Sequence, residues 1–128
     1  MKKHIPLEEL EIYKLARGLS KIGWEIYKDL DWQDKKTMGN QFIESVDSVG
    51  ANIAEGYGRF HYLEKIKFCY NARGSLNECN QYWIELLKER EKVYREKYDR
   101  FKEIAGKLSL KLNNYIASIY RSKTNNIH

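Results

Sequence analysis

Apolar side chains recur every three or four residues along almost the whole chain, and this spacing restricts the possible folds more than any other feature. It occurs in four segments, residues 7–30, 34–55, 62–90 and 94–121. On an α-helix, such spacing places the apolar side chains on one face, which can pack against other helices. The single proline, Pro6, precedes the first segment, so no later residue lacks the backbone N–H that a helix needs. The sequence therefore predicts four long helices.

The apolar stripe of each segment is the expected core. Along the chain, the four stripes consist of Ile12, Leu15, Leu19, Ile22, Ile26 and Leu30; Met38, Phe42, Val46, Val49 and Ile53; Cys69, Ala72, Leu76, Cys79, Trp83 and Leu86; and Tyr98, Phe101, Ala105, Leu108, Leu112, Tyr115 and Ile119. The two cysteines lie on the third stripe, and their spacing matches no common zinc pattern. We expect both to be small core residues with reduced thiols.

Residues between the segments indicate where the helices begin and end. Asp34 is the expected N-cap of the second helix, and Gly56 and Gly58 are expected to end it in the left-handed conformation that glycine adopts easily. The third turn has no glycine, proline or asparagine over residues 88–95, and we place it near 91–93 because the preceding stripe ends at Leu86 and Leu87. Short connections make successive helices antiparallel neighbours, so the predicted fold is an all-α, up-down-up-down four-helix bundle.

A chain of 128 residues is long enough for one domain with a buried core. We expect a single domain over residues 7–122, flanked by flexible termini at 1–6 and 123–128. Gly50 and Gly74 lie inside predicted helices and are expected to mark close approaches between them. No apolar run approaches the roughly 20 residues that cross a bilayer, and the basic N-terminus lacks the apolar segment of a secretory signal. The expected location is the cytoplasm, with no membrane partner.

The excess positive charge is concentrated at one end of the sequence. Residues 1–90 contain 14 Lys/Arg and 14 Asp/Glu, whereas residues 91–128 contain nine and four, which accounts for the net charge of +5. A basic helix face can contact phosphate backbones, although it can equally be a solvated surface. The candidate nucleic-acid contacts are Lys92, Arg95, Lys97, Arg100, Lys102, Lys107 and Lys111.

Polar residues gather in two short stretches, one on the second predicted helix and one on the third. The members singled out are Asn52, Glu55, Gly56, Arg59, Arg73, Gly74, Ser75 and Glu78. Glu55 and Glu78 have no histidine base or nucleophile beside them, and no histidine follows a glutamate at the Glu-x-x-His spacing of di-metal bundles. We therefore predict structural roles, including an ion pair of Glu55 with Arg59 or Arg73, and no catalytic residue, metal or cofactor. Replacing Glu55 by alanine is expected to cost roughly 1–3 kcal/mol if it leaves a buried partner unsatisfied.

Aromatic residues are abundant, with ten tyrosines and three tryptophans. They do not all fit within one narrow core. Exposed aromatic side chains can stack on nucleic-acid bases or form a subunit interface, and the interface is the interpretation we favour.

The two polar stretches also carry a family resemblance. Residues 48–59, Phe68 and residues 72–78, together with the opening residues 10–16, resemble the bacterial four-helix bundle family, also called the 23S rRNA-intervening sequence protein family. The resemblance implies an up-down-up-down bundle that assembles as a cyclic homopentamer. The fold of this family is also similar to that of the accessory protein of diversity-generating retroelements, which binds a reverse transcriptase and nucleic acid. Two departures are His61 in place of a capping serine before Glu64, and the missing glycine in the last turn.

Two functions arise as hypotheses. The first is a non-enzymatic, oligomeric module that binds RNA or DNA without sequence specificity, or a nucleic-acid-processing protein, through the basic residues of the fourth helix. The alternative is a purely structural homo-oligomer that binds a protein partner. An enzyme would need a pocket that holds both Glu55 and Glu78.

Overall fold

The structure, a computed structural model, describes residues 4–126, and every regular element in this range is helical. A short 3₁₀-helix, η1 (Leu7–Glu9), leads into α1 (Glu11–Lys28). The second arm of the bundle joins α2 (Trp32–Asp34), the π-helical turn η2 (Lys35–Gly39) and α3 (Asn40–Tyr57). The third arm joins α4 (Tyr62–Asn77), the π-helical turn η3 (Glu78–Trp83) and α5 (Ile84–Glu89). The fourth arm is α6 (Arg95–Asn126).

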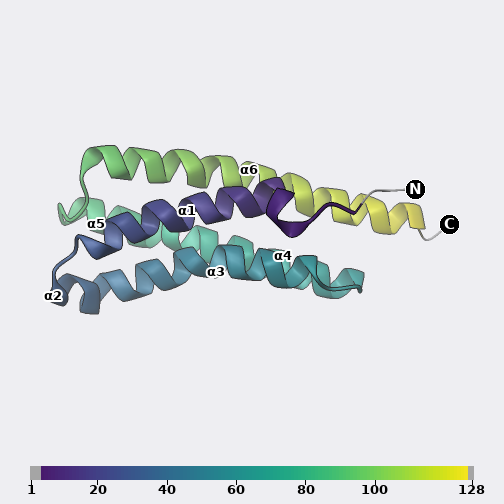
Figure 1. Cartoon of the computed structure of the whole chain (residues 1–128), viewed down its shortest axis with the longest axis horizontal. Coiled ribbons are helices and arrows are strands. Elements are labelled where there is room, and N and C mark those ends of the chain that lie inside the picture. The colour runs from purple at the N-terminus through teal and green to yellow at the C-terminus, as the bar shows by residue number, and fades with distance from the viewer. Residues whose placement is uncertain (1–3, 127–128) are drawn as a thin grey trace.

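The four arms form an antiparallel bundle (Figure 1). Helix α1 packs beside α3 and α6, and α4 packs beside the same two helices, so α1 and α4 lie diagonally opposite each other. Successive arms run in opposite directions, with both termini at the end of the bundle that carries the α3–α4 turn. The prediction of an all-α four-helix bundle is confirmed. No helix within residues 4–126 is long and apolar enough to cross a membrane.

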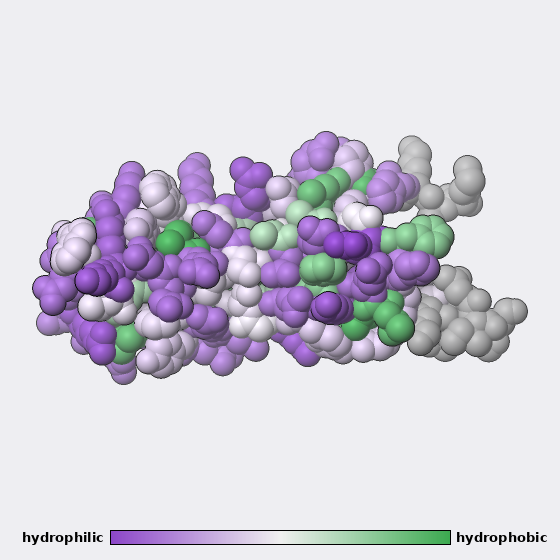
Figure 2. Space-filling view, turned by 90° about the horizontal axis from the view of Figure 1, so that it is seen from below, coloured by the Kyte–Doolittle hydropathy of each residue, from purple (hydrophilic) through white to green (hydrophobic). Residues whose placement is uncertain are grey.

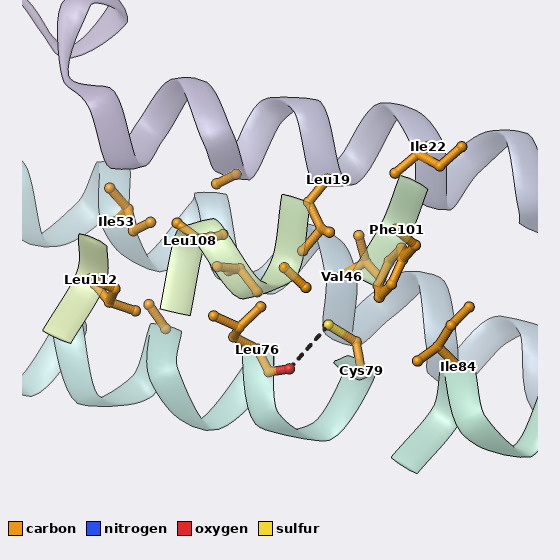
Figure 3. Packing of buried hydrophobic residues seen from close by; sticks show 14 of the residues in the cluster. Leu19, Ile22, Val46, Ile53, Leu76, Cys79, Ile84, Phe101, Leu108 and Leu112 are labelled. Atoms are coloured by element: carbon orange, nitrogen blue, oxygen red, sulfur yellow. Dashed lines mark hydrogen bonds between the residues drawn. The ribbon is translucent and has the colours of Figure 1, made fainter. Parts of the chain in front are cut away.

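A single hydrophobic core runs along the bundle axis. Leu19 and Ile22 of α1, Val46 of α3 and Phe101 of α6 point into this interior (Figure 3). All four are at most 1% exposed. These residues belong to the predicted stripes, because a three-four spacing keeps side chains on one face of each helix. Cys69 and Cys79 are also buried, and the Cys79 thiol donates a hydrogen bond to the carbonyl of Leu76 at 3.4 Å.

The third arm departs from its predicted stripe at the π-helical turn η3. Beyond Cys79 the fully buried residues are Ile84 and Leu87, whereas the predicted Trp83 and Leu86 are only partly buried. A π-helical turn closes its hydrogen bonds over five residues instead of four, so it adds one residue to the helix and rotates the residues after it. The apolar stripe therefore advances by one position after residue 83.

The second arm begins earlier than the sequence predicts. Asp31, not Asp34, is the N-cap: its backbone is extended, and its carboxylate accepts a hydrogen bond from the Asp34 N–H at 2.8 Å. Asp34 then lies in the first helical turn, where it forms an ion pair with Lys92 at 3.1 Å. The cap lies three residues before the expected one, because the Asp31 carboxylate can accept a hydrogen bond from a free backbone N–H just as that of Asp34 could.

Glycine does not end the second arm in the way expected. Gly58 caps α3 with a right-handed φ of −79°, and no glycine among the described residues has a positive φ. Gly56 instead lies buried where α3 and α4 approach each other closely. The prediction of a left-handed glycine cap is therefore wrong for this helix.

A left-handed residue ends the third arm instead, and it is Glu91, with a φ of 57°. The N–H of Lys92 donates to the carbonyl of Leu87 at 2.8 Å, and the N–H of Glu91 donates to that of Lys88 at 3.0 Å. These two bonds form the Schellman motif, in which this position is usually glycine. The turn thus lies between Glu89 and Arg95, where the sequence placed it near residues 91–93.

Replacing Glu91 by glycine should stabilise the protein. A residue with a Cβ costs about 1 kcal/mol or more in the left-handed region, and glycine removes this cost while keeping both capping bonds. We expect Glu91→Gly to raise the free energy of unfolding by about 1 kcal/mol, measured by urea denaturation. Glu91→Ala is the control, because it removes the same carboxylate but keeps the Cβ. If both variants gain equally, charge and not backbone strain is the cause.

Both chain ends are more regular than predicted. Helix α6 continues to Asn126, so residues 123–126 are helical where a flexible tail was expected. Near the N-terminus, the His4 ring stacks on Tyr57 with centroids 5.2 Å apart, and the Tyr57 hydroxyl donates to the carbonyl of Ile5. Residues 1–3 and 127–128 of the expected flexible ends lie outside the described residues.

Candidate functional site

Part of the predicted polar cluster joins α3 to α4. The Ser75 hydroxyl on α4 donates to the Ser48 hydroxyl on α3 at 2.9 Å. The Asn52 amide donates to the Ser48 hydroxyl at 3.0 Å and to the Ser48 carbonyl at 2.9 Å. These three side chains are partly buried and use one another as partners, which is the usual arrangement of polar groups between packed helices.

Glu55 lies in the last turn of α3, and Arg59 follows the end of that helix. The two residues form the predicted ion pair at 2.8 Å. Arg59 also reaches Glu64 at 3.8 Å, and its guanidinium lies over the Phe68 ring at 5.2 Å. The Glu55 side chain is 53% exposed, so water screens this pair strongly. The pair lies on the surface, so breaking it does not leave the buried, unsatisfied partner that was considered for Glu55.

The residues predicted on α4 point to other partners. Arg73 donates to the Asn113 side chain of α6 at 3.2 Å and lies over the Tyr70 ring at 4.7 Å, so it does not pair with Glu55. The Glu78 carboxylate accepts a hydrogen bond from the Trp83 indole at 2.7 Å. A hollow of about 140 Å³ between α3 and α4 includes Glu78 in its lining but not Glu55. The two glutamates therefore do not share a pocket.

The two glycines of the motif differ from each other. A Cβ at Gly56 would lie 2.8 Å from the Cβ of Phe68, so α3 and α4 can approach only because Gly56 has no side chain. A Cβ at Gly74 would meet no atom of the described residues within 4 Å, and Gly74 is exposed. A Cβ at Gly50 would make an ordinary 3.4 Å contact with Ala16. Close approach was expected at Gly50 and Gly74, but within this motif the tight contact is at Gly56. Outside the motif, a Cβ at Gly23 or Gly39 would also lie within 3 Å of a neighbouring side chain.

Reactive groups are scarce in the described part of the chain. Burial raises the pKa of Cys69 to about 11 and that of Cys79 to about 12, so both thiols are protonated at neutral pH. A protonated thiol is a poor nucleophile and a poor metal ligand. Within residues 4–126, no three His, Cys, Asp or Glu side chains meet as metal ligands would.

Most basic candidates on the fourth arm are already paired with acidic residues. Five of the seven form ion pairs within the described chain: Lys92 with Asp34, Arg95 with Asp99, Lys97 with Asp29, Lys102 with Glu85, and Lys111 with Glu11. Four of these acidic partners come from other arms. Arg100 and Lys107 are exposed and make no ion pair with a described residue. The charge excess of the last 38 residues is thus largely balanced where the arms meet.

Glu85 is the centre of a polar network between α5 and α6. Its carboxylate accepts a hydrogen bond from the Tyr98 hydroxyl at 2.6 Å and pairs with Lys102 at 3.0 Å. Lys102 also donates to the carbonyl of Asn80 at 2.8 Å. Partial burial opposes ionisation of Glu85, but the bonds from Tyr98 and Lys102 outweigh it and lower its pKa. Hydrogen bonding to Glu85 raises the pKa of Tyr98 to about 12.

Replacing Glu55 and replacing Glu85 should change the free energy of unfolding by different amounts, because Glu55 has an exposed partner and Glu85 has two partners between α5 and α6. We expect Glu55→Ala to cost less than about 0.5 kcal/mol, because the pair that it breaks is exposed. Glu85→Ala should cost about 1–2 kcal/mol, since Tyr98 and Lys102 lose a shared acceptor. The pKa of Glu85 is lowered by folding, so its contribution is present above its unfolded value of about 4.3 and is lost as pH falls further. Urea denaturation at neutral and acidic pH measures both; a larger loss at Glu55 than at Glu85 would contradict the assignment.

Four of the exposed large apolar residues lie in two places that the stripe pattern did not single out. One lies where α1 meets α2, with Trp24 54% and Trp32 75% exposed. The other lies at the α3–α4 turn, with Phe60 91% and Leu63 71% exposed. The signal available in the sequence was that these four residues fall off the apolar stripes, which leaves them without a place in the core.

Comparisons with known proteins support the fold. The model of the 23S rRNA-intervening sequence protein family matches residues 8–114. A crystal structure from Bacteroides thetaiotaomicron, described as a protein with unknown function from the S23 ribosomal protein family, is similar with a TM-score of 0.76. The two chains are 26% identical, and the match covers 82% of this chain and 97% of that one. No curated protein matches the chain.

Proposed function

The chain belongs to the 23S rRNA-intervening sequence protein family, and we propose that it is a non-enzymatic bundle that acts in the cytoplasm by associating with itself. The assembly proposed is the cyclic homopentamer that the family resemblance implies. The observation that supports self-association best is the exposed apolar surface at the α3–α4 turn.

This surface is apolar although the core of the bundle is complete without it. Phe60 and Leu63 are 91% and 71% exposed, and Tyr70 and Tyr120 nearby are 39% and 41% exposed. Figure 2 shows more apolar residues, in green, toward the end of the molecule that carries this turn than toward the opposite end. Grouped exposed apolar side chains on a soluble domain are typical of protein interfaces, where phenylalanine and tyrosine are enriched. A second copy of the chain is the partner we assign to this surface.

The polar residues support a non-enzymatic role. Glu55 and Glu78 have separate partners, and the two thiols are protonated at neutral pH. General acid–base or nucleophilic catalysis needs such groups to converge on one substrate position. Their dispersal favours structural work, in which they fix the contacts between the helices.

Nonspecific nucleic-acid binding by the fourth arm is the second candidate. It is favoured by Arg100 and Lys107, which are exposed and without an ion pair in the described chain, and by Arg95, whose side chain is 85% exposed. Phosphate groups could contact Arg100 and Lys107 directly, and Arg95 in place of its exposed partner Asp99. The other four basic candidates would first have to exchange their acidic partners.

Sedimentation equilibrium at micromolar protein concentration tests the main proposal. We expect a mass close to five times the 15.3 kDa of the chain. The double variant Phe60→Ser/Leu63→Ser should shift the protein to smaller species while keeping its helical circular dichroism. Leu110→Ser is the matched control, because Leu110 is 62% exposed but lies on α6. A wild-type protein that is only monomeric, or a double variant that assembles like the wild type, would overturn the proposal.

A further inference from the structure

We propose that the corner where α1 meets α2 binds single-stranded nucleic acid, with Trp24 and Trp32 stacking on bases and Lys35 and Lys36 contacting phosphates. This inference rests on the second candidate function, nucleic-acid binding, and places its main contact surface away from α6. The corner lies at the opposite end of the bundle from the apolar surface assigned to self-association (Figure 1).

The aromatic side chains at this corner are exposed and held in position. Trp24 stacks on Tyr27 with ring centroids 5.3 Å apart and planes inclined by 27°. The Tyr27 hydroxyl donates to the Asn40 side chain of α3 at 2.7 Å, and Gly39 packs against the Tyr27 ring. Asn40 and Gly39 therefore hold the Tyr27 ring in place. The Trp24 ring packs against Tyr27 and remains 54% exposed. A supported, solvated indole is a suitable stacking surface for a base.

Two of the aromatic rings at this corner, those of Tyr27 and Trp32, each have a lysine ammonium above them. The Lys35 Nζ lies over the Tyr27 ring at 5.1 Å, and the Lys36 Nζ lies over the Trp32 ring at 5.1 Å. Because Lys35 and Lys36 are consecutive, the two ring–ammonium pairs are next to each other along the chain. A single strand presents both bases and phosphates within one nucleotide, and adjacent aromatic and basic groups match that combination.

Acidic residues of the same segment are largely turned away from the lysines. Asp29, Asp31 and Asp34 line a hollow of about 600 Å³ between the α1–α2 and α5–α6 turns, whereas Lys35 and Lys36 are not part of its lining. Asp29 pairs with Lys97 and Asp34 with Lys92, and the Asp31 carboxylate caps α2. The carboxylates are thus occupied within the hollow, although Lys35 lies near enough to Asp29 to contribute to the lowering of its pKa, after Lys97. Lys35 and Lys36 make no ion pair with a described residue, and each ammonium lies over an aromatic ring instead.

This arrangement favours single strands over duplexes. Bases in a duplex are stacked on each other and offer no free face, whereas a single strand can turn one base onto Trp24 and another onto Trp32. No side chain here is arranged to read base edges, so we expect little sequence preference. Phosphate contacts by the lysines make the binding sensitive to salt.

Fluorescence provides the direct test. An oligodeoxythymidine of about 20 nucleotides should quench tryptophan emission, since two of the three tryptophans would stack on bases. We expect Trp24→Ala/Trp32→Ala to weaken binding at least roughly tenfold and to abolish most of the quenching. Lys35→Gln/Lys36→Gln should weaken binding and reduce its salt dependence between about 50 and 200 mM. A duplex of the same length should bind more weakly and quench less.

Two controls keep the result interpretable. Tyr82→Ala removes an aromatic ring of similar exposure, 57%, from the third arm, outside the proposed surface, and should leave binding unchanged. Arg100→Gln/Lys107→Gln removes two exposed cations of α6 and tests whether the fourth arm contributes to binding. Circular dichroism melting and sedimentation show whether each variant keeps its fold and assembly.

The outcomes separate this inference from the function on which it rests. Absence of binding by the wild type at low salt overturns both nucleic-acid proposals and leaves the self-association proposal intact. Binding that is lost in Arg100→Gln/Lys107→Gln but kept in both corner variants overturns the inference and retains the fourth arm as the surface. If a tryptophan variant fails to fold, unchanged affinity and salt dependence in Lys35→Gln/Lys36→Gln is enough to overturn it.

Discussion

Replacing Phe101 by alanine should destabilise the protein by about 3–5 kcal/mol, the range found when a buried phenylalanine is truncated and a cavity remains. Phe101 of α6 and Phe42 of α3 are both fully buried, and their rings contact each other with centroids 5.4 Å apart and planes inclined by 45°. The two rings meet in the interior of the bundle. Helices α3 and α6 both pack against α1 and α4, so they cannot easily move together to fill the cavity that alanine would leave. Domains of this size are usually stable by only about 5–15 kcal/mol, so this loss is a large share of the total.

Urea denaturation followed by circular dichroism measures the effect. Phe101→Leu is the control, because it keeps most of the volume and should cost less than about 1.5 kcal/mol. A loss below about 1 kcal/mol for the alanine variant would mean that the core collapses around position 101 and is not tightly packed there.

Placing a methyl group at position 56 should destabilise the protein, although alanine is a better helix former than glycine. A Cβ at Gly56 would lie 2.8 Å from the Phe68 Cβ and 3.5 Å from the Lys65 carbonyl oxygen. Neither atom is the free end of a flexible side chain, so relief requires α3 and α4 to move apart. We expect Gly56→Ala to cost about 1–3 kcal/mol, as other overpacked sites do.

The matched control is the same substitution on α6. A Cβ at Gly106 would meet no atom of the described residues within 4 Å, so Gly106→Ala should stabilise the protein by about 0.5–1 kcal/mol through helix propensity alone. The two variants should therefore change the urea midpoint in opposite directions. Equal gains at both positions would show that α3 and α4 do not pack closely at Gly56.

The residues of the candidate sites could be named from the sequence more readily than their partners. The pairing of Glu55 with Arg59 was one of two expected alternatives, and it is explained by their spacing of four residues on a helix. The pairing of Arg73 with Asn113, and of Lys97 with Asp29, joins residues 40 and 68 positions apart. No local pattern specifies such pairs. For the same reason, a count of basic residues over the last 38 positions could not show that Lys92, Lys97, Lys102 and Lys111 are paired, because other arms supply their carboxylate partners.

What the sequence by itself determined is the set of four amphipathic helices and the inner face of each. That information is local: the three-four spacing of apolar residues and the position of turn-forming residues act within a few turns of helix. Even the turn at Glu91 could be placed without glycine, because the apolar stripe stops shortly before it.

Only the tertiary structure decided which glycine allows close packing, where the π-helical turn rotates the third stripe, and which aromatic side chains remain in water. Gly56 and Gly74 both lie inside predicted helices or at their ends, but a Cβ at Gly56 would lie 2.8 Å from the Phe68 Cβ, whereas one at Gly74 would meet no atom of the described residues within 4 Å. The π-helical turn at residues 78–83 brings Ile84 and Leu87 inward in place of Trp83 and Leu86, because its extra residue rotates the helix that follows. These outcomes depend on the shape of the facing helices, which are distant in sequence, and so no periodicity within one helix could specify them.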